Sequence, residues 1–293
     1  MTGDIDARVS VAHDRSTDPG VLFELASDPS ARVRAAVAAH PEAPAEALRP
    51  LARDRDRDVR EAVARNPASS LANLLRLVGD ADRWVRWAVA ANPACNTRVR
   101  QQMVKAQDKE LRGLLAEMPA LEPDLAAILV EDSSPEVRER LAAHTGDPAV
   151  IAALLRDRTV RVRKGLAINE RTTAEQRSAL AKDSSPDVRA TLVRALRLDE
   201  ADLLSMVDDR SVDVRRSLAT SAVTPPHIRQ ALEKDPDESV AEDARRYRDL
   251  PPADKSAASK PAASEPAASE PVAPSRPGHR RAAGKRFPGK PAR

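Results

Sequence analysis

A period of 26 residues constrains the fold of this 293-residue chain more than any other feature of its sequence. A Val-Arg dipeptide recurs at this interval, with one spacing of 25 residues and with Leu111-Arg112 in the remaining register. A unit this short cannot bury an apolar face alone, so the period predicts an array in which each unit packs on the next. The valines of the dipeptide are Val33, Val59, Val85, Val137, Val162, Val188 and Val214.

Each unit is predicted to contain two short helices. A second Val or Leu follows the first after four residues, and this spacing faces inward from a helix. A later Leu or Met marks the second helix. Stacking must stabilise such short helices. The second inward positions are Val37, Val63, Val89, Leu115, Leu141, Leu166, Leu192 and Leu218, and the later ones are Leu51, Leu77, Met103, Leu129, Leu154, Leu180, Met206 and Leu232.

Proline, serine and asparagine mark the predicted helix ends. Ser134 and Ser185 each precede a proline, which predicts a capping serine with proline at the first helical position. Asn66 and Asn92 also precede prolines, and they are predicted to end helices in a left-handed conformation.

The unit resembles that of the leucine-rich repeat variant family, and it is also similar to HEAT repeats. The similarity spans roughly residues 5–246. It implies a right-handed superhelix with one α-helix and one shorter, often 3₁₀, helix per unit. Some members hold an iron-sulfur centre on a cysteine cluster, which the single Cys95 cannot provide. Residues 54–80 carry the pattern best, in Asp54, Val59, Arg60, Val63, Ala64, Asn66, Pro67, Leu74, Leu77 and Asp80.

The predicted fold is an all-α, right-handed α-solenoid of about eight two-helix units. Residues 28–234 hold these units, 1–27 form a degenerate capping repeat, and 235–250 form a half repeat. Residues 251–293 carry nine of the 24 prolines and a charge of +6, whereas residues 1–250 carry −3. Few large apolar side chains occur in this tail, so we expect it to be disordered.

An aspartate stands six residues before the arginine in seven units, whereas the fourth unit has Ala106 there. Repetition in so many layers favours a structural ladder over an active site. Each Asp can accept backbone N–H bonds, and each Arg can tie it to the next unit. If the pair is buried, Asp132→Ala or Arg138→Ala is expected to destabilise the fold. The ladder comprises Asp28, Arg34, Asp54, Arg60, Asp80, Arg86, Asp132, Arg138, Asp157, Arg163, Asp183, Arg189, Asp209 and Arg215.

Catalytic and metal-binding motifs are not found. His40 and His144 occupy the register of the asparagines that end helices, which favours helix termination over metal ligation. The glycines do not cluster into a phosphate-binding loop. We therefore expect no enzymatic activity and no cofactor.

Trp84 and Trp87 depart from the repeat pattern. Both are predicted to point away from the core, at positions that are mostly charged in other units. With Arg83 they could anchor a partner. Alternatively, they could repair packing beside the fourth unit, where Gly113 and Glu117 are unusual.

The end of the tail is strongly basic. It is compatible with RNA, DNA, an anionic membrane or an acidic protein surface. Neither a signal sequence nor an apolar membrane span is evident, so we expect a cytoplasmic protein. The candidate residues are Arg280, Arg281, Lys285, Arg286 and Lys290.

The sequence therefore predicts a non-enzymatic scaffold that binds a protein or another macromolecule along its solenoid surface. The alternative is a nucleic-acid-associated, HEAT-like protein that uses the basic tail or a basic groove.

Overall fold

The computed structural model describes residues 4–118, 121–196 and 198–248. Across these ranges the chain forms nineteen α-helices and no strands. The prediction of an all-α solenoid with two helices per unit is therefore confirmed. The second segment of each unit is an α-helix of six to eight residues rather than a 3₁₀ helix. The basic candidates of the tail lie outside the described residues.

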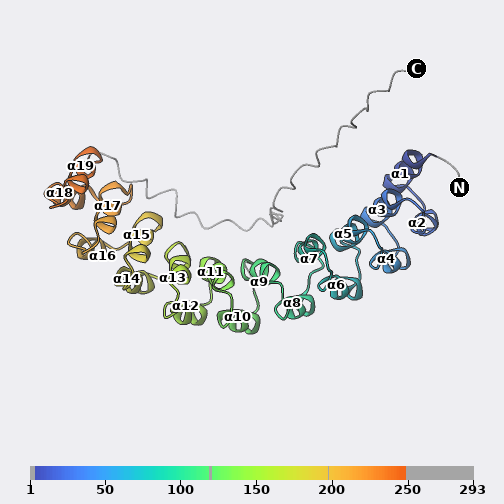
Figure 1. Ribbon diagram of the computed structural model, residues 1–293, viewed down its shortest axis with the longest axis horizontal. Helices are drawn as coiled ribbons and strands as arrows, with labels where there is room; N and C mark the ends of the chain where they lie inside the picture. The colour runs from blue at the N-terminus through green and yellow to red at the C-terminus, as the bar shows by residue number, and fades with distance from the viewer. Residues whose placement is uncertain (1–3, 119–120, 197, 249–293) are drawn as a thin grey trace, which may run out of the picture. The chain divides into compact units, whose positions relative to one another are not determined.

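The first helices of successive units pack on one another and form one row (Figure 1). Most begin three residues after a ladder aspartate, and several end just before a turn that contains an asparagine or a histidine. We call this the odd row. Its helices are α1 (Ile5–His13), α3 (Ala31–Ala39), α5 (Arg57–Arg65), α7 (Arg83–Ala90), α9 (Lys109–Ala116), α11 (Pro135–His144), α13 (Val160–Ala167), α15 (Pro186–Ala195), α17 (Val212–Thr220) and α19 (Glu238–Arg246).

The second helices form a parallel arrangement beside the first, which we call the even row (Figure 1). None of the described helices combines the length and the apolar composition needed to cross a bilayer. The even row comprises α2 (Pro19–Leu25), α4 (Ala45–Leu51), α6 (Leu71–Leu77), α8 (Thr97–Met103), α10 (Pro123–Val130), α12 (Pro148–Leu154), α14 (Ala174–Ala181), α16 (Glu200–Ser205) and α18 (Pro226–Leu232).

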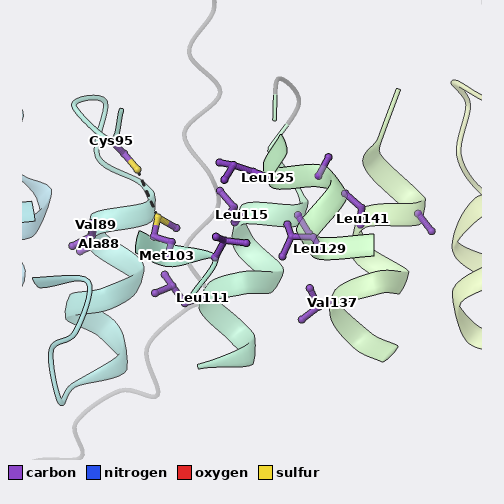
Figure 2. Close-up of a cluster of buried hydrophobic side chains, with 14 of the residues drawn as sticks. Ala88, Val89, Cys95, Met103, Leu111, Leu115, Leu125, Leu129, Val137 and Leu141 are labelled. Carbon is purple, nitrogen blue, oxygen red and sulfur yellow. Dashed lines mark hydrogen bonds between the residues drawn. The ribbon is translucent and has the colours of Figure 1, made fainter. Parts of the chain in front are cut away.

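One apolar core runs between the two rows. All the predicted inward Val, Leu and Met side chains are buried, so this part of the prediction is confirmed. Figure 2 shows Leu111 and Leu115 of α9 and Leu125 and Leu129 of α10 as parts of this core. Each fully buried Val or Leu contributes roughly 1.5 to 3 kcal/mol, and most of this burial occurs between neighbouring helices.

The predicted helix ends are partly wrong. Pro135 and Pro186 do occupy the first helical position. However, the Ser134 and Ser185 side chains do not cap their helices. The ladder aspartate accepts the serine N–H instead, as from Ser134 to Asp132 (2.8 Å).

The helix exits differ from the prediction as well. Asn66 follows its helix in an extended conformation. No non-glycine residue in the described part of the chain has a positive φ, so the left-handed exits are not present there. The asparagine side chains instead donate to backbone oxygens of the preceding unit.

Candidate interaction site and inter-unit ladders

Each ladder arginine binds the aspartate of the following unit. Arg34 donates from Nε to Oδ2 of Asp54 (2.6 Å) and from Nη2 to Oδ1 (2.9 Å). Its Nη1 donates to the backbone oxygen of Asp28 in its own unit (2.8 Å). The guanidinium therefore joins two consecutive turns, while Oδ1 of Asp54 also accepts the N–H of Asp56 (2.8 Å).

This contact links nine pairs of consecutive units among the described residues. It includes two residues beyond those predicted at the ends, because Arg8 begins the ladder and Asp235 completes it. The side chains are largely shielded from solvent. The pairs are Arg8–Asp28, Arg34–Asp54, Arg60–Asp80, Arg86–Asp108, Arg112–Asp132, Arg138–Asp157, Arg163–Asp183, Arg189–Asp209 and Arg215–Asp235.

The fourth unit keeps the ladder although it has Ala106 at the expected position. Arg86 donates from Nε to Oδ2 of Asp108 (2.7 Å), two residues later. Asp108 is also the N-cap of α9, because it accepts the N–H of Glu110 (2.9 Å). The Asp108 carboxylate thus both binds an arginine and caps a helix. In the preceding unit, Asp80 binds the arginine and Asp82 caps the helix.

Asp132 and Arg138 are not each other's side-chain partners. Asp132 pairs with Arg112 of the preceding unit, whereas Arg138 pairs with Asp157 of the following one. Arg138 meets Asp132 only at its backbone oxygen (2.6 Å). A substitution at either position therefore leaves a different partner uncompensated.

Arginine hydrogen bonds favour the ionised form of several ladder carboxylates. Burial raises the pKa of Asp54, but hydrogen bonds from Arg34 and from the Asp56 N–H outweigh it, so the pKa lies below its ordinary value. The same balance lowers the pKa of Asp80 and Asp157. For Asp235, the hydrogen bond from Arg215 is the largest cause of the lowered pKa. Such carboxylates are poor candidates for proton acceptors near neutral pH.

A second ladder of amides and one imidazole crosses the ends of the odd-row helices. Asn66 donates from Nδ2 to the backbone oxygens of Ala38 (2.7 Å) and His40 (2.8 Å) in the preceding unit. Asn92 does the same to Ala64 (2.6 Å) and Asn66 (2.9 Å). These side chains therefore satisfy carbonyls that the preceding helix leaves open.

The two histidines in this register differ. His40 is buried, and its Nε2 lies 3.0 Å from the backbone oxygen of Asp14 in the preceding unit. The His144 side chain is exposed, and its Nδ1 lies 2.8 Å from the Arg140 oxygen within its own helix. Asn169 bonds to the preceding unit at Ala142 and Thr145. No group of three or more His, Cys, Asp or Glu side chains in the described ranges could hold a metal ion.

Ion pairs connect neighbouring helices along the outer surface of the odd row. Arg140 of α11 reaches Glu110 (3.0 Å) and Glu117 (3.1 Å) of the preceding unit. Lys109 of α9 pairs with Glu136 of α11 (2.8 Å). Such exposed pairs contribute little stability individually, but they show that charged side chains occupy this surface on α9 and α11.

The corresponding surface of α7 is aromatic. Trp84 and Trp87 meet edge to face, with ring centroids 5.0 Å apart and an interplanar angle of 76°. The guanidinium carbon of Arg83 lies 4.9 Å from the centre of Trp84 and 5.6 Å from that of Trp87. We call these three residues the tryptophan patch.

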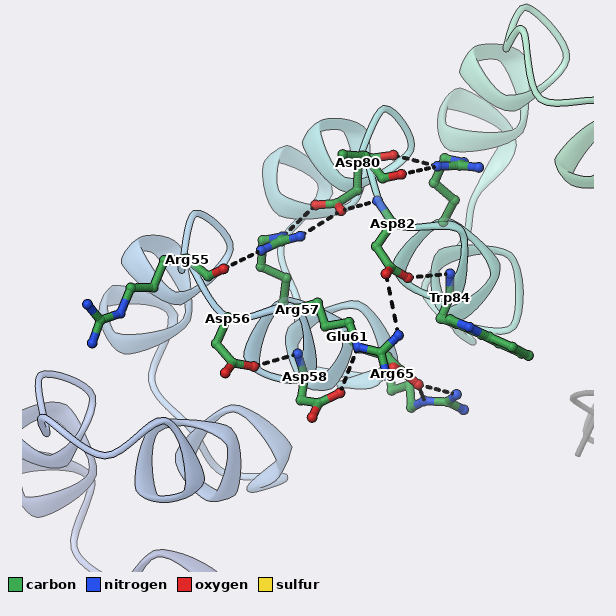
Figure 3. A network of polar contacts seen from close by, with 12 residues as sticks. Arg55, Asp56, Arg57, Asp58, Glu61, Arg65, Asp80, Asp82 and Trp84 are labelled. Atoms are coloured by element: carbon green, nitrogen blue, oxygen red, sulfur yellow. Dashed lines mark hydrogen bonds and ion pairs between the residues drawn. The ribbon is translucent and has the colours of Figure 1, made fainter. Parts of the chain in front are cut away.

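Asp82, at the start of α7, connects the helix that carries the tryptophan patch to α5. Asp82 caps α7 by accepting the N–H of Trp84 (2.8 Å), and it lies 3.5 Å from Arg57 of α5 (Figure 3). Both tryptophans are partly exposed, as their predicted outward direction requires. Nε1 of Trp87 is covered and has no hydrogen-bond acceptor. Buried donors without acceptors are uncommon in stable folds.

The space beside Gly113 is filled by Arg140. A methyl group added to Gly113 would meet Cδ of Arg140 at 3.0 Å. This arginine also binds Glu117, the second unusual residue of the fourth unit. Thus the nearest cover of the predicted gap is an arginine from α11, which weakens the alternative that the tryptophans are there to repair packing.

Comparisons with known proteins support the repeat assignment. The sequence model of the leucine rich repeat variant family matches residues 31–56, so the predicted resemblance is confirmed for one unit. No curated protein matches the sequence.

Three solved structures of low identity are also similar to the chain. One, a computationally designed armadillo repeat protein for modular peptide recognition, is 19% identical, with 78% of this chain and 96% of the other covered and a TM-score of 0.22. Another designed armadillo repeat protein is 17% identical, with 79% and 98% covered and a TM-score of 0.23. An engineered protein is 16% identical, with 79% and 97% covered and a TM-score of 0.19.

Proposed function

We propose that this α-solenoid is a non-enzymatic scaffold that binds a protein partner through the odd row, with the tryptophan patch as the anchor. The observation that carries the proposal is the aromatic cluster on a surface where other units place charged side chains. Tryptophan and arginine are the residue types most often responsible for binding energy at protein interfaces. Aromatic anchors also lose little conformational entropy when they are already packed together.

The geometry of the patch supports binding more than packing repair. The two rings and Arg83 contact one another within α7. In α11, by contrast, Arg140 reaches back to residues of the preceding unit. The ring and cation contacts of the patch thus lie within one helix, whereas the ion pairs of Arg140 join two units. The unsatisfied Nε1 of Trp87 further favours a role other than stability.

The ladders support the non-enzymatic part of the proposal. Ladder carboxylates are the most regular acidic groups, and each of the nine described accepts hydrogen bonds from an arginine. An active site requires a distinct arrangement of groups, whereas this arrangement recurs from unit to unit.

Affinity capture from a nuclease-treated lysate tests the proposal. The Trp84→Ala/Trp87→Ala variant is expected to lose the specific protein captured by the unaltered chain. Arg161→Ala/Lys164→Ala, at the equivalent positions of α13, is the matched control and is expected to retain it. Both variants are expected to keep an unfolding temperature close to that of the unaltered chain, as surface substitutions usually do.

Other outcomes would assign the patch a different role. Undiminished capture by the tryptophan variant would contradict the proposal, and a lower unfolding temperature with unchanged capture would indicate packing repair. Truncation at residue 250 separates the patch from the basic tail. Capture that disappears only with the truncation, or that occurs only from a lysate left without nuclease, would favour the alternative of nucleic-acid association through the tail.

A further inference from the structure

A polar pocket lies between α4 and α6 of the even row. Its volume is about 450 Å³, within the range of ligand pockets. The helices contribute one face each, and the small side chains Ala45 and Ala72 leave room between them. The tryptophan patch belongs to α7 in the other row, so this pocket is a separate site. Its polar lining residues are Glu46, Arg49, Arg53, Ser70, Asn73 and Arg76.

The three arginines of the pocket keep most of their donors free. Arg76 uses Nε to bind the backbone oxygen of Ala52 (3.3 Å), which orients its guanidinium. In the described part of the chain, no acidic side chain forms an ion pair with Arg49, Arg53 or Arg76. Glu46 is the one acidic side chain in the lining. The pocket therefore has an excess of two positive charges.

Asn73 is an independent sign of a missing ligand. The residue is only 5% exposed, and its Nδ2 has no hydrogen-bond acceptor. Other units place mainly apolar residues at this position, for example Val99, Leu125 and Ile228. A buried amide with an unused donor costs stability, so its presence at the pocket wall points to an acceptor supplied from outside the chain.

The equivalent contact between α14 and α16 shows that the pocket lacks a hydrogen-bond acceptor between Asn73 and Arg49. Asp202 of α16 has the register of Asn73, and Ser178 of α14 has that of Arg49. There, the Ser178 hydroxyl donates to Oδ2 of Asp202 (2.5 Å). The Asn73 amide nitrogen and the Arg49 guanidinium are both donors and cannot pair with each other. An anion between them would accept from both.

We propose that the pocket between α4 and α6 binds a dianionic phosphoryl group. A phosphoryl group carries about −1.5 to −2 charges and three acceptor oxygens, which match the two excess positive charges and the donors that line the pocket. Arginine forks bind phosphate oxygens in pairs. A carboxylate has a single charge and would leave one positive charge uncompensated.

Titration calorimetry with inorganic phosphate, above the second pKa of phosphate, tests this proposal. Saturable binding is expected, and acetate is expected to bind more weakly. Arg49→Gln/Arg53→Gln is expected to weaken phosphate binding by about tenfold or more. The matched control is Arg156→Gln/Arg158→Gln, which removes two exposed arginines near α12 and is expected to leave binding unchanged.

Asn73→Ala separates binding from folding. Removing the unpaired donor is expected to maintain or raise the unfolding midpoint while weakening phosphate binding. No saturable binding to the unaltered chain, equal weakening in both double variants, or acetate binding as tight as phosphate would overturn the proposal.

A phosphoserine peptide then distinguishes the two sources of the group. Competition between the peptide and phosphate would place the phosphoryl group on a protein. Binding of phosphate without competition would assign the pocket to a free phosphate-sized ion. Each of these results is consistent with phosphoryl recognition, and neither depends on the tryptophan patch.

Discussion

Arg34 and Asp54, twenty residues apart, form a bidentate ion pair between consecutive units. Their side chains are only 9% and 8% exposed. The same arginine binds the Asp28 backbone oxygen in its own unit. Each pair thus fixes the position of one turn relative to the next. An apolar seam can slide, but directional hydrogen bonds define one register.

Removing either side of the ladder is expected to destabilise the fold. Asp132→Ala leaves Arg112 without its partner, and Arg138→Ala leaves Asp157 without its own. Each variant is expected to lose about 3 to 5 kcal/mol of unfolding free energy, because a shielded charge is left uncompensated. Urea denaturation measures the loss.

Arg32→Ala provides the comparison for these variants. Arg32 pairs with Asp6 at the surface, where the two side chains are 67% and 71% exposed. Little change in unfolding free energy is expected. Equal losses for Arg32→Ala and Arg138→Ala would argue against a special role for the ladder.

In the second ladder, replacing an asparagine by aspartate is expected to cost more stability than replacing it by alanine. Asn92→Ala removes two hydrogen bonds to backbone oxygens of the preceding unit and should cost about 1 to 3 kcal/mol. Asn92→Asp should cost more, because a carboxylate would face the same oxygens. Thermal melts of the two variants, with the exposed His144→Ala as control, check this order.

Acid is expected to weaken the stacking of units. The pKa values of Asp54, Asp80, Asp157 and Asp209 are lowered in the folded chain, where arginine hydrogen bonds outweigh burial. Their contribution to stability is therefore complete above the unfolded-state pKa of about 4 and is lost as the pH falls through the lower folded values. Melting temperatures measured from neutral pH downward should fall below about pH 4. An unchanged melting temperature across that region would contradict the ladder's contribution.

Close packing between α11 and α13 predicts a strict requirement at Gly165. A methyl group there would lie 2.7 Å from the Glu139 backbone oxygen, and a backbone atom cannot easily move away. Gly165→Ala is expected to cost about 1 to 3 kcal/mol. Gly79→Ala, whose nearest neighbour would be 3.8 Å away, is expected to change stability by less than about 0.5 kcal/mol. Similar unfolding midpoints for both variants would be evidence against this packing.

Much of the fold could be predicted because the same apolar spacing recurs in successive units, so the helix assignment does not depend on any one unit. Val59 and Val63 recur at helical spacing in unit after unit, and both are buried. The role of Asn66 could not be predicted in the same way. Its proline neighbour suggested a local helix end, whereas the side chain bonds to residues about 26 positions earlier. Such a bond depends on stacking geometry that spacing alone does not reveal.

The candidate sites depended on departures from the repeat, and of the two sites only the tryptophan patch was recognised from the sequence. The tryptophans are conspicuous because their residue type is rare in this chain. Asn73 is less conspicuous, yet a polar residue at an otherwise mainly apolar register was a usable signal. Asp108 was not predicted because it stands two residues later in its unit than the other ladder aspartates do. Its carboxylate nevertheless binds the arginine of the preceding unit, as theirs do.

A double-mutant cycle on Arg34 and Asp54 tests the central claim most directly. Unfolding free energies of the unaltered chain, Arg34→Ala, Asp54→Ala and the double variant give the coupling between consecutive units. A coupling of about 2 kcal/mol or more is predicted, because the pair is shielded and doubly hydrogen-bonded. A coupling near zero would mean that the ladder does not hold the units together.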